Sequence, residues 1–244
     1  MEEQQELPQG WVWTTVSQLG KVSGGLTKNA KRGLHELQLP YLRVANVQAN
    51  ELRLDDIETI GIYPGELPRT LLEKGDLLVV EGNGSPDQIG RVAIWNGSIT
   101  PCLHQNHLIK VRLRFPEHGS YVLHWLLSKN GRDNIRQVAS STSGLYTLSI
   151  SKIEALPVPF APLPEQRRIV EKLEELFSKL DAGVAAVRRT QALLKRYRQS
   201  VLHAAVTGEL TRAWREAHPA PAETGATLLA RIRAERRAQW EGCC

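Results

Sequence analysis

The chain has little cysteine and no long apolar run, and each scarcity excludes a class of protein. Only three of its 244 residues are cysteine, and two of these are the terminal pair Cys243 and Cys244, so a disulfide framework is excluded. No apolar run approaches the roughly 18 residues of a membrane span. The acidic, polar stretch Met1–Gly10 is the opposite of a signal peptide. We therefore expect a soluble, cytoplasmic protein with no membrane partner.

Signatures of DNA-modifying enzymes are also missing. None of the ten lysines has an acidic residue two positions before it, as PD-(D/E)xK nucleases require. No two prolines are adjacent, as the amine-binding motif of amino-methyltransferases requires, and the phosphate-binding motif GxxxxGK[ST] is absent. We expect no catalytic residues in this chain. An enzyme with an unrecognised site stays open as an alternative, which turnover by the isolated chain would reveal.

Two short segments imitate a cofactor site and a metal site. Gly82-Asn-Gly84 follows an apolar run like a nucleotide-binding loop, but Pro86 blocks an immediate helix, so a turn is the favoured interpretation. Cys102, His104 and His107 are of metal-ligand types, but no second cluster completes four ligands. We expect neither a cofactor nor a metal here, and interpret His104 as part of a loop that faces a partner.

Charge is segregated along the chain. The net charge is +5, and the whole excess lies in residues 161–244, since residues 1–160 contain 16 basic and 16 acidic residues. Within that first part, positions 51–90 carry 3 bases against 9 acids, and positions 91–160 carry 8 against 3. A partner meets one face of a protein and not its average charge, so this segregation favours a polyanionic partner.

The sequence predicts an α+β fold with a β-dominated, irregular domain at residues 1–160. Strand-like runs occur at 11–16, 77–80, 91–95 and 108–114, the last of which alternates apolar and basic residues. Tyr121–Leu127 has helical spacing. The prolines between Pro157 and Pro164 predict a stiff, extended link that ends the domain.

A long helix is predicted after this link, within residues 161–210. No proline occurs from Glu165 to about Gly208, and apolar residues recur every seven positions. This pattern predicts a coiled-coil-type helix of about 40 residues, roughly 60 Å long, that stops at Gly208. Residues 211–244 are expected to form a linker and a basic helix at Thr227–Trp240.

The apolar rows of this helix need a partner, because a lone apolar stripe is unfavourable in water. Packing back onto its own domain is the alternative, although a 60 Å helix exceeds the reach of such a domain. The basic residues from Arg188 to Arg198 contact phosphate or an acidic partner, or form a solvated face. The residues expected to form the dimerisation or partner surface are Ile169, Leu173, Leu176, Leu180, Val187, Leu194, Tyr197 and Val201.

Three segments carry a family resemblance. Leu7-Pro8-x-Gly10-Trp11 with Leu19-Gly20 opens the domain, Leu163–Val170 reads LPEQRRIV before the heptads, and Ala205–Thr211 contains Gly-Glu-Leu. Together they resemble the specificity subunits of bacterial and archaeal type I restriction–modification enzymes. Those subunits usually contain two target recognition domains and two conserved helices, whereas this chain has one of each and looks like a half subunit.

The resemblance implies a non-catalytic reader of double-stranded DNA. Methyltransferase (M) and restriction (R) subunits would carry the reactions, with S-adenosylmethionine, ATP and Mg bound on those partners and no cofactor in this chain. A second copy of the chain, or another half specificity subunit, would complete the bipartite reader. A coiled-coil adaptor that does not read DNA is the alternative from another functional class.

Polar loops of the domain supply the candidate DNA contacts. Arg can pair with guanine and Asn or Gln with adenine, while Ser, Thr and Lys mostly position phosphates. Ordinary solvation in a loop is the alternative for each residue. The candidates are Lys28, Asn29, Lys31, Arg32, Asn83, Ser85, Gln88, Arg91, His104, Gln105, Asn106, Ser140, Thr142, Ser143 and Tyr146.

Overall fold

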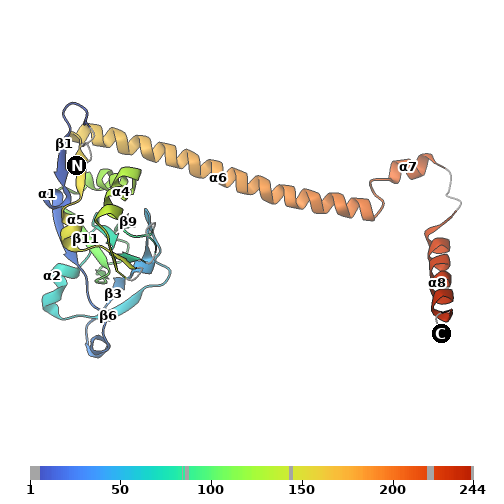
Figure 1. The fold of residues 1–244 in the computed structure, drawn as a ribbon, viewed down its shortest axis with the longest axis horizontal. Coiled ribbons are helices and arrows are strands. Elements are labelled where there is room, and N and C mark those ends of the chain that lie inside the picture. The colour runs from blue at the N-terminus through green and yellow to red at the C-terminus, as the bar shows by residue number, and fades with distance from the viewer. Residues whose placement is uncertain (1–5, 84, 86–87, 143–144, 219–222, 243–244) are drawn as a thin grey trace. The chain divides into compact units, whose positions relative to one another are not determined.

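The computed structural model describes residues 6–83, 85, 88–142, 145–218 and 223–242 (Figure 1). The chain divides into two compact units, Met1–Leu176 and Phe177–Cys244, which are described separately. The first unit mixes short strands and helices, and the second is helical, so the predicted α+β class is confirmed. Within the described ranges, no helix is both long and apolar enough to cross a membrane.

An antiparallel four-stranded sheet forms the centre of the first unit. Its strands, in spatial order, are β2 (Gly20–Gly24), β11 (Leu108–Leu113), β7 (Leu77–Val80) and β9 (Val92–Ile94). All four residues of β7 are buried, because both faces of the sheet are covered. The apolar run of β7 therefore lacks the alternation of a half-exposed strand. The strands predicted at 77–80, 91–95 and 108–114 are confirmed.

Two hydrophobic clusters cover this sheet. Leu77 and Val79 pack on one face against α3 (Gly119–Leu127) and α4 (Lys129–Val138). Leu78 and Val80 pack on the other face, in a cluster that contains the fully buried Trp95 side chain. The helix predicted at Tyr121–Leu127 is confirmed.

Smaller sheets surround the central one. One sheet contains, in spatial order, β10 (Leu103–His104), β3 (Gln38–Leu42) and β6 (Glu58–Gly61). A second contains β12 (Ser140–Thr142), β13 (Leu145–Thr147) and β8 (Gly82–Asn83). A third consists of β4 (Val47–Gln48) and β5 (Glu51–Leu52). The short helices are α1 (Val16–Leu19), α2 (Leu67–Thr70) and α5 (Ile150–Glu154). A third cluster of buried residues, around Leu26, Tyr41 and Leu103, supports the β10–β3–β6 sheet.

The proline-rich segment is a strand of the domain, so the prediction of a stiff link was wrong. Strand β14 (Pro157–Phe160) pairs antiparallel with β1 (Val12–Thr15), and Val158 is fully buried. Proline lacks the N–H that a central strand needs, but a two-stranded edge tolerates it. Trp125 donates from its indole nitrogen to the Pro157 carbonyl at 2.8 Å, which fixes this strand against α3.

One continuous helix, α6 (Leu163–Val206), confirms the prediction from the heptads (Figure 1). Its 44 residues correspond to about 66 Å. The helix stops as predicted: Gly208 has φ +76°, and the Glu209 amide bonds to the Ala204 carbonyl at 2.8 Å. Helices α7 (Arg212–Ala217) and α8 (Gly225–Glu241) follow, and α8 contains the basic helix expected at Thr227–Trp240.

The first compact unit extends to Leu176, beyond the boundary expected at residue 160. The first turns of α6 belong to it because their side chains bond to the domain. Trp11 donates from its indole nitrogen to Glu165 at 3.0 Å. The buried Gln166 amide donates to the Ala161 carbonyl at 2.8 Å, and its oxygen lies 2.9 Å from His118 Nδ1. The Glu-Gln pair of the LPEQ segment therefore anchors the start of the helix.

Candidate nucleic-acid interface

Four segments meet at the end of the central sheet where β7 stops and β11 starts. The amide of Asn106 bonds to the Leu26 carbonyl, and the amide of Glu81 to the His107 carbonyl, both at 2.9 Å. The amide of Leu148 bonds in turn to the Glu81 carbonyl at 2.8 Å. We call this line of segments the loop edge and define it as residues 26–29, 81–83, 105–107 and 146–148.

The loop edge brings together candidates from distant parts of the sequence. Tyr146 of β13 lies opposite Asn83 of β8, so the two loops that contain them are neighbours. Strand β12, which carries Ser140 and Thr142, pairs with β13. Ser143 lies outside the described residues. The candidates on the loop edge itself are Lys28, Asn29, Asn83, Gln105, Asn106 and Tyr146.

The side chains of two of these candidates already bond to other residues of the domain. Lys28 is exposed, and its ammonium lies 2.8 Å from the Glu58 carboxylate, which raises the pKa of Lys28. The side-chain oxygen of Asn29 accepts the Arg32 amide at 3.2 Å and so caps the short 3-10 helix Ala30–Leu34, on which Lys31 is exposed. Gln105 and Asn106 are half-buried.

Arg32 is not a surface residue, which corrects its proposed role. Its side chain is buried and donates two hydrogen bonds to the Glu66 carboxylate, at 2.7 and 2.9 Å, and a third to the Thr27 carbonyl at 2.7 Å. The bonds from Arg32 lower the pKa of Glu66 to about 2. Four of the five N–H donors of this guanidinium are engaged inside the fold, where they join the loop before α2 to the 3-10 helix, so the side chain is not placed to read a base.

His104 is likewise buried, which corrects the prediction of a loop that faces a partner. It belongs to β10, which pairs in parallel with β3, and its exposed fraction is 0%. Its Nδ1 lies 2.8 Å from the Leu108 carbonyl oxygen. Burial lowers the pKa of His104 to about 4, so the ring is neutral near pH 7. In the part of the chain that the structure describes, no group of three or more His, Cys, Asp or Glu residues could hold a metal ion.

The buried imidazole predicts acid-sensitive stability. Between the ordinary His pKa of about 6.5 and the folded value of about 4, only the unfolded chain binds the proton, so stability falls as the pH falls. We expect the free energy of unfolding to drop by about 2 kcal/mol from pH 7.5 to pH 5. Urea unfolding across this range measures the drop. His104→Asn keeps a donor near Nδ1 but cannot titrate, so it should flatten the curve; an equal slope in that variant would contradict the assignment.

Arg91 is a half-buried candidate that is held by neutral groups. Its guanidinium donates to the side-chain oxygens of Gln48 at 2.8 Å and Gln88 at 3.3 Å. Among the residues described, no carboxylate pairs with it, so the alternative of an ion pair with the acidic 51–90 segment is not observed. Burial and the nearby Arg53 lower the pKa of Arg91. Neutral amides hold the group in place and leave its charge available to a partner.

Glu58, which no motif of the sequence marks, joins Lys28 to the end of β3. Its carboxylate accepts hydrogen bonds from Lys28 and Tyr41, both at 2.8 Å, and from Arg43 at 2.5 Å. Lys28 and Tyr41 hold the pKa of Glu58 below its usual value. No local pattern marks this residue, because its partners come from two other segments of the chain, one with Lys28 and one with Tyr41 and Arg43.

The second unit exposes the apolar rows of α6. The exposed fractions are 62% for Leu180, 58% for Val187 and 55% for Leu194. Gly183 leaves a shallow hollow on the helix surface, walled by Leu180, Val184 and Val187. Rows of apolar side chains beside such a hollow provide the knobs and holes that a second helix fills.

Comparison with known proteins gives one consistent result. The family described as the type I restriction modification DNA specificity domain matches residues 8–186. The chain is similar to the EcoKI specificity subunit of Escherichia coli K12 (32% identity, 82% of this chain and 44% of that protein) and to the StySPI specificity subunit of Salmonella potsdam (31%, 93% and 50%). The chain thus spans about half the length of the curated relatives it matches.

Two solved structures share the fold. One comes from a study of complex assembly and conformational transition in a type I R-M system, with TM-score 0.61 and 21% identity over 84% of this chain and 48% of that one. The other is the HsdS subunit from Thermoanaerobacter tengcongensis, with TM-score 0.58 and 18% identity over 91% and 53%. At these identities the likeness concerns the fold alone, and it spans about half of each of those chains.

Proposed function

Because the chain belongs to the family of the type I restriction modification DNA specificity domain, we propose that it reads one half of a bipartite site in double-stranded DNA. The observation that carries this proposal is the convergence of polar loops on the loop edge. Gln105 and Asn106 offer side-chain amides of the kind that pairs with adenine.

The chain is proposed to act without a catalytic site of its own. It would dock the M subunits, and through them the R subunit, while S-adenosylmethionine, ATP and Mg would act on those partners. The isolated chain should then neither bind S-adenosylmethionine nor cut DNA. Calorimetric binding of that cofactor to the pure chain would contradict this division of roles.

A second copy of the chain, or another half specificity subunit, is proposed to complete the reader. The exposed row of Leu180, Val187 and Leu194 supports pairing through α6. An antiparallel pair of such helices would hold two recognition domains apart, so a homodimer would read an inverted repeat with a nonspecific gap. The nonspecific gap between the two half-sites would arise because α6, about 66 Å long, would keep the two domains many base pairs apart along the DNA.

Retention on DNA separates this function from that of a coiled-coil adaptor. The chain, assembled with its M subunits, should bind a duplex that contains the cognate site more tightly than a random duplex. Binding to both should weaken steeply with salt, since phosphate contacts release counterions. Negligible salt-dependent retention of the assembled complex would favour the adaptor.

Replacement of Arg91 tests base reading at one position. Arg91→Ala should cost about 1–3 kcal/mol of binding on the cognate site and relax the preference at one base pair, because a bidentate contact to guanine is lost. Methylation rates across a library of single-base site variants measure both effects. Arg53→Ala is the matched control, since Arg53 is exposed and lies near Arg91. An unchanged preference profile in Arg91→Ala would remove this residue from the interface.

A further inference from the structure

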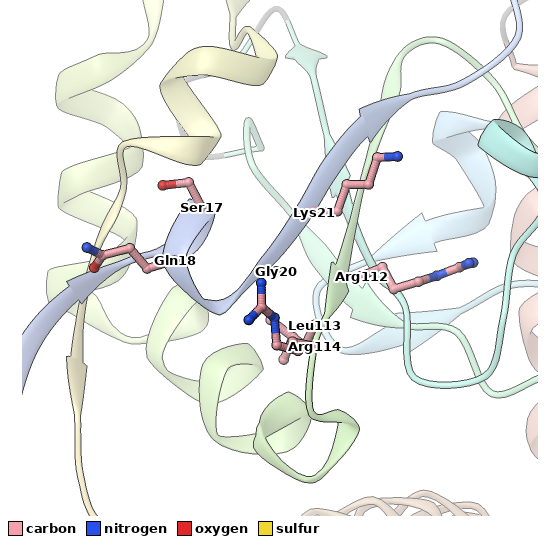
Figure 2. Close-up of a pocket in the computed structure, with 7 residues that line it drawn as sticks. All are labelled: Ser17, Gln18, Gly20, Lys21, Arg112, Leu113 and Arg114. Carbon is pink, nitrogen blue, oxygen red and sulfur yellow. The ribbon is translucent and has the colours of Figure 1, made fainter.

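A hollow lined by cationic side chains lies at the end of β11 opposite to the loop edge (Figure 2). It has a volume of about 330 Å³ and opens where β2 pairs with the last residues of β11. Lys21 comes from β2, Arg112 from β11, and Arg114 from the residue after it. Ser17 and Gln18 of α1 complete the wall on the other side.

Two of the three cations have no anionic partner among the residues that the structure describes. Lys21 and Arg114 are exposed, and within the described segments neither side chain forms an ion pair or a hydrogen bond. Arg112 differs, because it is held by Asp76 at 2.7 Å and by Glu73 at 2.5 Å. The hollow therefore keeps two positive charges for a ligand, beside a third that is already neutralised.

Further positive charge lies directly beside the hollow. Lys110 and Arg69 line an adjoining depression that also includes Lys21 and Arg112. Burial, and next the charge of Arg112, lower the pKa of Lys110 to about 8. The Lys110 ammonium donates to the Arg69 and Leu71 carbonyls, both at 2.8 Å, so it supports the wall and is not available itself.

Among the neutral residues of the hollow, Ser17 shares a hydrogen bond with Thr15 at 2.9 Å, and Gln18 has a free donor. The side-chain oxygen of Gln18 accepts from Thr14 Oγ1 at 2.6 Å and from the Thr15 amide at 3.2 Å, which leaves the Gln18 amide nitrogen as its free end. Gly20 lets the two strands approach closely, because a Cβ there would collide with the Arg112 carbonyl oxygen. The cationic side chains that line this hollow are of the kind that binds an anion with several oxygens, such as a phosphate.

We propose that this hollow binds a backbone phosphate of duplex DNA that lies outside the bases met by the loop edge. The proposal rests on the proposed function, since it assigns a further contact to the same DNA. The six residues of β11 span about 20 Å, which equals roughly six base pairs of duplex. Lys21 and Arg114 are exposed and open to a passing strand, which favours a polymer backbone over an enclosed small anion.

The test measures DNA affinity as a function of salt for the chain assembled with its M subunits. Fluorescence anisotropy would compare the wild type with Lys21→Gln/Arg114→Gln, on cognate and on random duplexes with long flanks. The variant should lose about 0.9 from the slope of log affinity against log salt for each phosphate released. One such contact corresponds to about fivefold in affinity near 0.15 M salt, and cognate and random DNA should be affected equally.

Controls separate this site from a general loss of charge. Lys74→Gln/Arg53→Gln removes two exposed cations elsewhere on the domain and should leave the slope unchanged. Lys21→Arg/Arg114→Lys keeps both charges and should restore the wild-type slope. On a duplex trimmed to the recognition site, the Lys21→Gln/Arg114→Gln variant should bind as well as the wild type. Thermal unfolding checks that each variant is folded.

Three results would overturn the proposal. The first is an unchanged slope and affinity of the double Gln variant on long duplexes. The second is normal DNA binding with loss of the M subunits on size exclusion, which would assign the hollow to a protein surface. The third is calorimetric binding of inorganic phosphate that needs Lys21 and Arg114 while DNA binding does not. If the wild-type complex itself fails to bind DNA, the proposed function fails, independently of this site.

Discussion

Replacement of Leu180 and Leu194 by Asp is expected to convert a dimer of this chain into monomers. Both side chains are more than half exposed in the single chain, at 62% and 55%. In an antiparallel pair they would be buried, and each Leu would contribute about 2 kcal/mol from apolar area removed from water. An Asp at either position would also place an unpaired carboxylate in the seam. The dissociation constant should therefore rise by at least about a thousandfold.

Light scattering at micromolar concentration measures this effect directly. The matched control is Ala185→Asp/Ala192→Asp, which introduces the same charges on the opposite face of α6. The control lowers helix propensity at least as much, so circular dichroism should show equal helix content in both variants. A dimer that survives Leu180→Asp/Leu194→Asp, or a wild-type monomer with an intact helix, would contradict pairing through this face.

Loss of the Asp76 carboxylate is expected to cost about 3 kcal/mol of unfolding free energy. Asp76 is 2% exposed and accepts from Arg112 Nε at 2.8 Å and Nη2 at 2.7 Å. It also accepts the Glu73 amide at 2.8 Å, which closes the turn before β7. Asp76→Ala would leave the Arg112 charge and the Glu73 amide without this acceptor. This cost lies at the lower end of the range expected for breaking a buried ion pair, because the Arg112 side chain is 30% exposed.

Asp56→Ala is the matched control for this experiment. Asp56 pairs with Arg43 at 2.6 Å, but its side chain is 84% exposed, so solvent screens the interaction. Its loss should cost less than about 1 kcal/mol. Urea denaturation at neutral pH measures both variants. Equal costs for the two substitutions would mean that burial does not strengthen the Asp76–Arg112 pair.

Features that depend on local chemistry are predictable from the amino-acid sequence alone. Seven-residue spacing between Glu165 and Gly208 predicts α6, and Gly208 ends it because glycine readily adopts the positive φ of a helix stop. The unbroken apolar run Leu77–Val80 identifies a buried strand for the same local reason. The LPEQ segment and its neighbours carried the family resemblance, although its contacts with Trp11 and His118 were not visible in the sequence.

Which polar residues face solvent depends on the packing of distant segments and is not predictable from local sequence. Arg32 and His104 stand in polar segments, yet both are buried. Lys110 sits in an alternating strand like Arg112, but the Arg69–Leu71 backbone covers it and accepts its hydrogen bonds. Pro157–Phe160 became a strand only because β1, about 145 residues away in sequence, pairs with it. In each case the covering group comes from a distant part of the chain, and local periodicity carries no information about that group.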